Sequence, residues 1–160
     1  MRIGIDLGGS HVAVGLISEE GKILIKKQAD ILKKYKEEGR VQKFIVDTIL
    51  QRIDEILEES GLNKEFITQI GIATPGIFEN GCILNAVNLG IEELAIENKI
   101  KLKYDLKIKG DNDVKCAAIA EQKYGSLKGY KDAVFLTIGT GIGGGYIYDE
   151  KIIVPKTNPG

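Results

Sequence analysis

The chain has 160 residues, 43% of them hydrophobic, and a formal net charge of −1 from 22 basic and 23 acidic side chains. This length and composition predict one folded domain, or one domain and the beginning of a second. The balanced charge provides no basic surface for nucleic acid or an anionic membrane. No apolar run approaches the roughly 20 residues of a membrane helix, and the N-terminus has no signal-peptide pattern. We therefore expect a cytoplasmic protein without a nucleic-acid or membrane partner.

Alternating apolar residues predict three strands near the N-terminus, which form an antiparallel meander with a pair of glycines at its first corner. These strands cover residues 2–7, 11–17 and 22–26. The period then changes to that of an amphipathic helix over residues 39–60, and Gly61 is suited to a left-handed C-cap.

The remaining sequence predicts two strands and two helices in alternation, followed by a strand pair at the end. These elements cover residues 67–73, 91–98, 106–108, 113–124, 133–138 and 146–148, with a further strand at 152–154. The order describes a mixed α/β domain. A hairpin at a chain terminus has little to pack against, so we expect the sequence to be cut from a longer one.

Two glycine-rich turns, each directly after a short apolar strand, carry the strongest functional signal. The first contains Asp6, Gly8, Gly9 and Ser10, and the second contains Gly139, Thr140 and Gly141. Glycine backbone can approach an anion closely, and its N–H groups can line a concave anion site. The pair predicts two loops that close on nucleotide phosphates, with Asp6 holding Mg²⁺ directly or through water. An Asx turn at a tight hairpin is the alternative role for Asp6.

The second turn matches the pattern G-x-G-x-x-G, which in a dinucleotide-binding fold opens a helix. Here the β-forming residues 146–148 follow it, so we predict a hairpin instead. No phosphate-binding loop of the type G-x-x-x-x-G-K-[ST] occurs in the sequence.

Asp113 opens the helix over 113–124, where it is a candidate general base for phosphoryl transfer. Asn112 or Asp111 can cap that helix while Asp113 faces a cleft, and a plain N-cap is the alternative for the whole segment. A helix N-terminus favours a negative charge. Thr74-Pro75-Gly76 ends a buried strand, and the amides of Asn85 and Asn88 suit a polyhydroxylated ligand, although turn chemistry also explains them.

The single histidine and the two cysteines are given structural roles. His11 begins a strand beside the first turn, which accounts for it without catalysis. Cys82 and Cys116 have no close spacing, so neither a disulfide framework nor a zinc cluster is indicated. We expect two reduced, apolar side chains.

Six segments together resemble the ROK family (repressor, open reading frame, kinase), whose kinases include bacterial glucokinases and acylated-mannosamine kinases. They occur in the family's order: IGIDLGGS (3–10), GIATPG (71–76), NL (88–89), GDND (110–113), AAIAE (117–121) and GTGIGGG (139–145). The resemblance implies the ribonuclease H-like, actin-type ATPase fold, an α/β fold with a mixed five-stranded sheet and flanking helices. It implies a first lobe over 1–125 and the start of a second lobe over 126–160.

The resemblance also implies transfer of the ATP γ-phosphoryl group to a hexose hydroxyl, with Mg²⁺ present. The two glycine turns bind the nucleotide phosphates and Asp113 is the base. The implied sugar-binding residues are Gly76, Asn88, Asn112 and Asp113. The identity of the sugar and the oligomeric state stay open, although the family often forms homodimers.

The sequence departs from the family pattern in three places. Ser10 stands where Thr is more usual and keeps the hydroxyl. The family's Glu-x-Gly-His segment and its zinc motif would follow residue 160, so we expect no zinc motif within this chain and poor activity of the chain alone. No helix-turn-helix precedes Met1, which favours the kinase branch over the repressor branch.

Two other functions stay open. A ribonuclease H-like nuclease shares the fold, but it needs several carboxylates around paired metals, and only Asp6 and Asp113 are well placed. A non-catalytic sugar-binding regulator is the second alternative. The presence of Asp6, Asp113 and both glycine turns favours an active kinase over this regulator.

Overall fold

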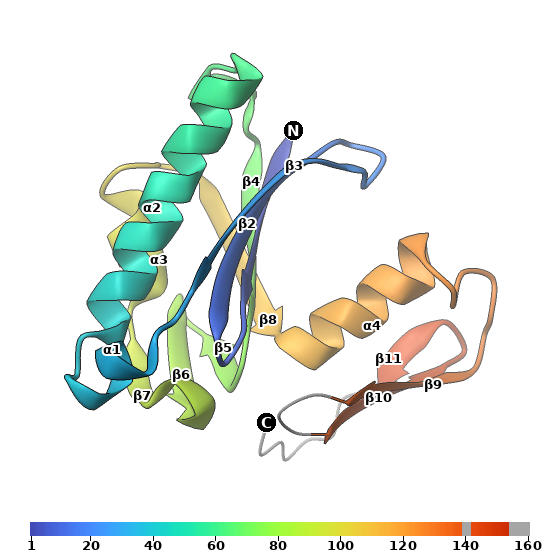
Figure 1. Ribbon diagram of the computed structural model, residues 1–160. Coiled ribbons are helices and arrows are strands. Elements are labelled where there is room, and N and C mark those ends of the chain that lie inside the picture. The colour runs from blue at the N-terminus through green and yellow to red at the C-terminus, as the bar shows by residue number, and fades with distance from the viewer. Residues whose placement is uncertain (139–141, 154–160) are drawn as a thin grey trace.

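The computed structural model describes residues 1–138 and 142–153, and a mixed five-stranded sheet, sheet A, lies at its centre (Figure 1). The strand order is β3-β2-β1-β4-β8. Neighbours among the first three strands are antiparallel, whereas β4 and β8 run parallel to β1. The strands are β1 (Arg2–Leu7), β2 (His11–Ile17), β3 (Ile23–Asp30), β4 (Gln69–Thr74) and β8 (Lys107–Asn112).

The two faces of sheet A follow from the alternation of apolar and small residues along its strands. In β1, Ile3, Ile5 and Leu7 are buried on one face, while Gly4 and Asp6 face the other. The predicted bounds of the first two strands are confirmed, and the third strand is longer than its apolar run because pairing with β2 extends it to Asp30.

Helix α2 (Val41–Ser60) covers the apolar face of sheet A (Figure 1). Its side chains Ile45, Ile49, Ile53 and Ile56 form one stripe and are buried in the core with the isoleucines of the sheet. The helix ends where Gly61 adopts a φ of 65°, the left-handed conformation expected of a C-cap. The predicted helix and its cap are therefore confirmed.

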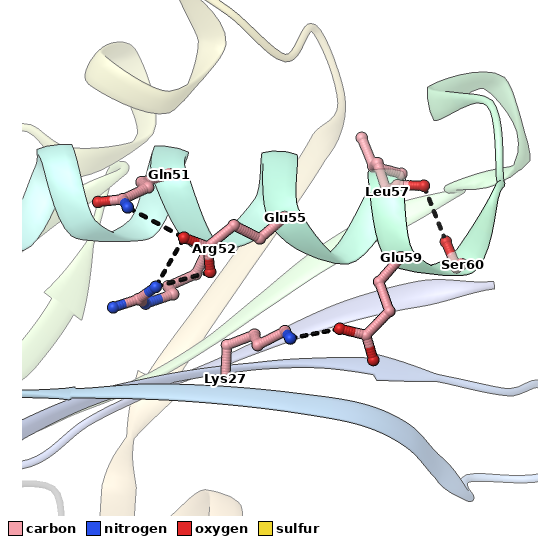
Figure 2. A network of polar contacts seen from close by, with 7 residues as sticks. All are labelled: Lys27, Gln51, Arg52, Glu55, Leu57, Glu59 and Ser60. Carbon is pink, nitrogen blue, oxygen red and sulfur yellow. Dashed lines mark hydrogen bonds and ion pairs between the residues drawn. The ribbon is translucent and has the colours of Figure 1, made fainter.

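A network of polar side chains runs along α2 and reaches strand β3 (Figure 2). The Glu55 carboxylate accepts hydrogen bonds from Gln51 Nε2 at 2.9 Å and from Arg52 Nη1 at 2.6 Å. Lys27 of β3 donates to Glu59 near the end of the helix. Exposed ion pairs of this kind contribute little to stability, so the buried stripe dominates the packing of α2.

A second, three-stranded sheet, sheet B, follows β4 and lies at the end of sheet A. Its order is β5-β6-β7, with β5 (Ile77–Glu79), β6 (Cys82–Ala86) and β7 (Ile91–Leu94). The short helices described are α1 (Lys33–Glu37), η1 (Lys64–Phe66), η2 (Val87–Leu89) and α3 (Ile96–Lys101). Of these, η1 comes directly before β4, whereas η2 and α3 flank β7.

The helix expected over 91–98 is wrong. Ile91 and Leu94 are both buried, and their three-residue spacing imitates a helical face. The segment instead pairs with β6 as strand β7, and the helix begins only at Ile96. Pairing with a distant segment overrides the local pattern here.

Helix α4 (Asp113–Tyr124) and a third sheet, sheet C, lie on the opposite side of sheet A from α2 (Figure 1). Sheet C consists of β9 (Ala133–Ile138), β10 (Ile142–Tyr148) and β11 (Lys151–Ile153). Strands β9 and β10 are antiparallel, which confirms a hairpin in place of a dinucleotide-binding helix. Over the described ranges 1–138 and 142–153, none of the helices combines the length and the apolar character needed to span a bilayer.

Candidate active site

The carboxyl ends of the three parallel strands bring the predicted polar residues to one edge of sheet A. The register pairs Asp6 of β1 with Ala73 of β4, and Ala73 with Asp111 of β8. Thr74 is paired with Asn112 one residue further along. Ligands of open α/β sheets bind at this edge, so the strand order itself assembles the candidate site.

A cleft of about 630 Å³ lies between the small-residue face of sheet A and helix α4. The strands contribute glycine and alanine to this face, and these short side chains leave space between sheet A and α4. Three carboxylates line the cleft, those of Asp6, Asp111 and Asp113. Cys116 lies on the α4 side, where burial, with the charge of Asp111, raises the pKa of its thiol to about 11. Both cysteines are free and half-buried.

The first glycine turn connects β1 and β2 and is closed by a hydrogen bond from the Gly8 N–H to the His11 carbonyl at 3.0 Å. The His11 ring lies directly over Gly8, where a Cβ atom would come within 2.4 Å of Cε1. Any larger residue at position 8 would displace this ring. His11 Nε2 also lies 3.4 Å from Asp6 Oδ2, and the Asp6 side chain is 58% exposed in the cleft.

At the start of α4, the structure distinguishes the roles of Asn112 and Asp113, which the sequence alone left open. Asn112 Oδ1 accepts hydrogen bonds from the N–H groups of Val114 at 3.0 Å and Lys115 at 3.3 Å, so Asn112 is the N-cap. Asp113 Oδ1 also accepts from the Val114 N–H at 2.9 Å, and Asp113 lines the cleft. The arrangement in which Asn112 caps while Asp113 faces a cleft is confirmed.

Asp111 is a cleft carboxylate that the sequence reasoning considered only as a cap. Its Oδ1 accepts from the Asn112 N–H at 2.9 Å, and its Oδ2 forms an ion pair with Lys115 Nζ at 2.5 Å. The signal that identifies Asp111 is the one used for Asp6, namely a carboxylate at the end of a parallel strand. The paired Lys115 distinguishes Asp111 from Asp113.

Two of the predicted sugar-binding residues are joined directly. The Gly76 carbonyl accepts a hydrogen bond from Asn112 Nδ2 at 3.3 Å. Gly76 has a φ of 77°, and a Cβ atom there would come within 2.4 Å of the Leu84 carbonyl oxygen, so only glycine fits. Asn88 lies elsewhere, against the first glycine turn, 3.5 Å from the position that a Cβ of Gly9 would occupy.

The second glycine turn, with Gly139, Thr140 and Gly141, lies outside the described residues, and its role stays a prediction. The strand that follows it is placed. A Cβ on Gly143 of β10 would come within 2.5 Å of Val114 Cγ2. The β9–β10 hairpin therefore contacts the first turn of α4, the turn that begins with Asp113.

The donors in the cleft are compatible with magnesium bound mainly by a nucleotide. Within residues 1–138 and 142–153, no three His, Cys, Asp or Glu side chains are grouped closely enough to form a metal site of their own. Mg²⁺ commonly takes one or two carboxylates and completes its octahedron with water and phosphate oxygens. The exposed carboxylate of Asp6 beside the glycine turn fits that mode of binding.

The strand order β3-β2-β1-β4-β8, with helices on both faces, is that of the actin-like ATPase fold within the ribonuclease H-like class. The ROK family model matches residues 2–156, and the chain belongs to the ROK family.

The chain is similar to ROK kinases and also to ROK repressors. It is 29% identical to a glucokinase of Halalkalibacterium halodurans over 94% of this chain and 45% of that protein. It is 27% identical to a xylose repressor of Caldicellulosiruptor bescii over 94% of this chain and 37% of the repressor. A ROK family glucokinase from Streptomyces griseus, solved in complex with glucose and AMPPNP, superimposes with a TM-score of 0.79 at 28% identity, covering 95% of this chain and 46% of that one. The chain thus spans less than half the length of these proteins.

Proposed function

We propose that the complete gene product is a cytoplasmic, ATP-dependent sugar kinase of the glucokinase type. The observation that carries this proposal is that Asp6 and Asp113 line the same cleft. Asp6 lies near the end of strand β1, and Asp113 is the first residue of helix α4. One carboxylate is suited to the metal–phosphate side and the other to the sugar side. The similarity to glucokinases supports the same activity.

In the proposed reaction, Asp113 accepts the proton of the attacking sugar hydroxyl while the hydroxyl oxygen bonds to the γ-phosphorus and the bond to ADP breaks. The N–H groups of the first glycine turn and the Ser10 hydroxyl orient the phosphates. Gly76 and Asn112 hold the sugar, and Asn88 contacts it from η2, next to the first glycine turn. Asp6 would hold Mg²⁺, directly or through water, and the ion would supply neutralisation of the phosphate charge.

Two lobes belong to the same proposal. Residues 1–125 form the first lobe and residues 126–160 begin the second, whose glycine turn at 139–141 is the second phosphate-binding turn of this proposal. The contact between Gly143 and Val114 supports this arrangement because it brings the hairpin to the start of α4.

A non-catalytic sugar-binding regulator is the second candidate, and the similarity to a xylose repressor favours it. Regulator and kinase make different use of the same cleft. Both bind sugar, but only a kinase needs a base at Asp113.

The test is an ADP-release assay on the complete gene product with a panel of hexoses, including glucose, mannose and N-acetylmannosamine. We expect sugar-dependent turnover. We further expect Asp113→Asn to lower kcat by about 10²–10⁴-fold, with little change in sugar affinity, because only the proton acceptor is lost.

Asp105→Asn, which neutralises an exposed carboxylate outside the cleft, is the matched control and should leave kcat unchanged. Sugar binding by calorimetry without turnover would replace the kinase with the regulator. An unchanged kcat in Asp113→Asn would remove Asp113 from the base role.

A further inference from the structure

Lys36 joins two segments of the candidate site that are distant in the sequence. Its Nζ donates a hydrogen bond to the Gly9 carbonyl at 2.6 Å and another to the Asn88 carbonyl at 2.7 Å. Gly9 belongs to the first glycine turn, and Asn88 belongs to η2. One ammonium group therefore bridges the segment proposed to bind phosphate and a segment proposed to bind sugar.

The chemistry of lysine suits this bridge. An ammonium group has three donors and no acceptor, so it can serve two carbonyl oxygens at once. Hydrogen bonds from a charged donor are shorter and stronger than those between neutral groups. The Lys36 side chain is half-buried, which reduces competition from water for the two carbonyls.

The helix that carries Lys36 is anchored independently of the site. Helix α1 has five residues, and its Tyr35 ring stacks on Phe44 of α2 with 4.4 Å between the ring centroids. The Arg40 N–H donates to the Tyr35 carbonyl at 2.8 Å. Lys36 thus reaches the two turns from a short helix that is held against α2.

The two bridged segments also contact each other. A Cβ on Gly9 would lie 3.5 Å from Asn88 Cβ, an ordinary van der Waals distance. Leu89, next to Asn88, is fully buried, and Gly90 ends η2 in the left-handed conformation. The first turn and η2 are therefore connected twice, by direct contact and through the Lys36 ammonium.

We infer that Lys36 is a positioning residue that couples the nucleotide-phosphate turn to the Asn88 segment, so that a ligand on one side orders the other. The inference rests on the proposed function, which assigns the first glycine turn to the phosphates and the Asn88 segment to the sugar. Lys36 contacts neither reacting group and acts through the backbone of Gly9 and Asn88.

The experiment measures the coupling itself in the complete gene product. Calorimetry gives the Kd of AMPPNP without glucose and with saturating glucose. We expect glucose to tighten AMPPNP binding about fivefold or more in the wild type. Lys36→Met, which keeps the aliphatic stem and removes the donors, should bring that ratio to about one, and Lys36→Arg should restore part of it.

Lys34→Met is the matched control because Lys34 is an exposed lysine of the same helix, and it should keep the wild-type ratio. A wild-type protein without coupling, or a Lys36→Met variant with the wild-type ratio, overturns the inference. A general loss of stability would weaken AMPPNP binding both with and without glucose, but it would not bring the ratio of the two Kd values to one, because glucose favours the folded chain. The ratio therefore separates positioning from folding.

Two further measurements cover the remaining outcomes. If Lys36→Met fails to fold, amide hydrogen exchange in the wild type tests whether a ligand on one segment orders the other. Glucose alone must slow exchange at the Ser10 amide, and AMPPNP alone must slow exchange at the Leu89 amide. Should the gene product bind neither ligand, the proposed function fails. In that case Lys36→Met must still accelerate exchange at the Ser10 and Leu89 amides, relative to Lys34→Met. Acceleration at only one of these amides, or at neither, overturns the inference that Lys36 bridges the two segments.

Discussion

The two sides of sheet A differ in how completely they bury their apolar residues. On the α2 side, helix and sheet share one continuous core in which residues such as Ile49 and Ile70 are 0% exposed. On the other side, α4 packs on one face of sheet C, and the opposite face leaves Leu136 63% and Ile138 84% exposed. The first side is complete in its packing, whereas the second presents apolar strand residues to solvent.

This difference teaches where the described residues obtain their stability. The core of sheet A and α2 is formed by residues 1–112, which also carry the first glycine turn. Exposed apolar patches mark surfaces that associate with something else. The proposal that 126–160 begins a second lobe gives the open face of sheet C such a role.

The largest expected effect separates the two sides directly. Ile49→Ala should lower the free energy of unfolding by about 2–5 kcal/mol, because it leaves a cavity in the shared core. Leu136→Ala should change it by about 0.5 kcal/mol or less, because the side chain is exposed. Urea denaturation measures both. Equal losses in the two variants would contradict the comparison.

The next effect tests how sheet B is packed against the complete side. A Cβ on Gly110 of β8 would come within 2.4 Å of the Phe78 ring of β5. Gly110→Ala should therefore destabilise the protein by about 1–3 kcal/mol through overpacking, and Phe78→Leu in the same chain should recover part of the loss. In the matched variant Gly71→Ala, the new methyl group meets nothing within 4 Å, so thermal unfolding should be nearly unchanged. A similar loss in both would show that backbone effects dominate.

The smallest effect concerns a buried phenol that joins the end of α3 to α2. Tyr104 donates to Asp54; burial raises the pKa of Tyr104, and the hydrogen bond raises it further. The folded chain therefore holds the phenolic proton more tightly than the unfolded chain. The stabilisation is present below about pH 10 and is lost as the pH rises above that value.

Tyr104→Phe should cost about 1 kcal/mol at neutral pH and should flatten the loss of stability above about pH 10. Tyr130→Phe is the control on the second side, because Tyr130 is 62% exposed. Unfolding curves at pH 7 and above pH 10 measure the free energy of unfolding of the wild type and of both variants. An alkaline loss of stability that persists unchanged in Tyr104→Phe would assign it to another group.

The sequence predicted best those elements whose pattern depends on one buried face. The strands 2–7 and 11–17 and the helix ending at Gly61 have apolar residues at the right period and clear stop signals. Strand β8 was predicted too short because its polar end, Gly110 to Asn112, is a strand only through pairing with β4. The hairpin β5–β6 was not predicted, although its turn at Asn80 and Gly81, both with positive φ, is a local signal.

The candidate site shows the same division. Asp6 and Asp113 could be identified because each stands at a boundary between elements, where the polar residue interrupts an apolar pattern. Lys36 could not be identified, since it lies among charged residues and its partners Gly9 and Asn88 come close only in the fold. Contacts of a side chain with backbone carbonyls leave no pattern in a single sequence.

Asn112 serves two neighbours with the two ends of one amide, its oxygen toward the start of α4 and its nitrogen toward Gly76. Aspartate or serine would preserve the first connection as a cap, but aspartate carries no donor when ionised and serine is shorter. The position therefore tolerates little evolutionary drift, even though each of its two tasks alone admits several residues. A lineage that replaces this asparagine would have to rebuild the Gly76 corner at the same time.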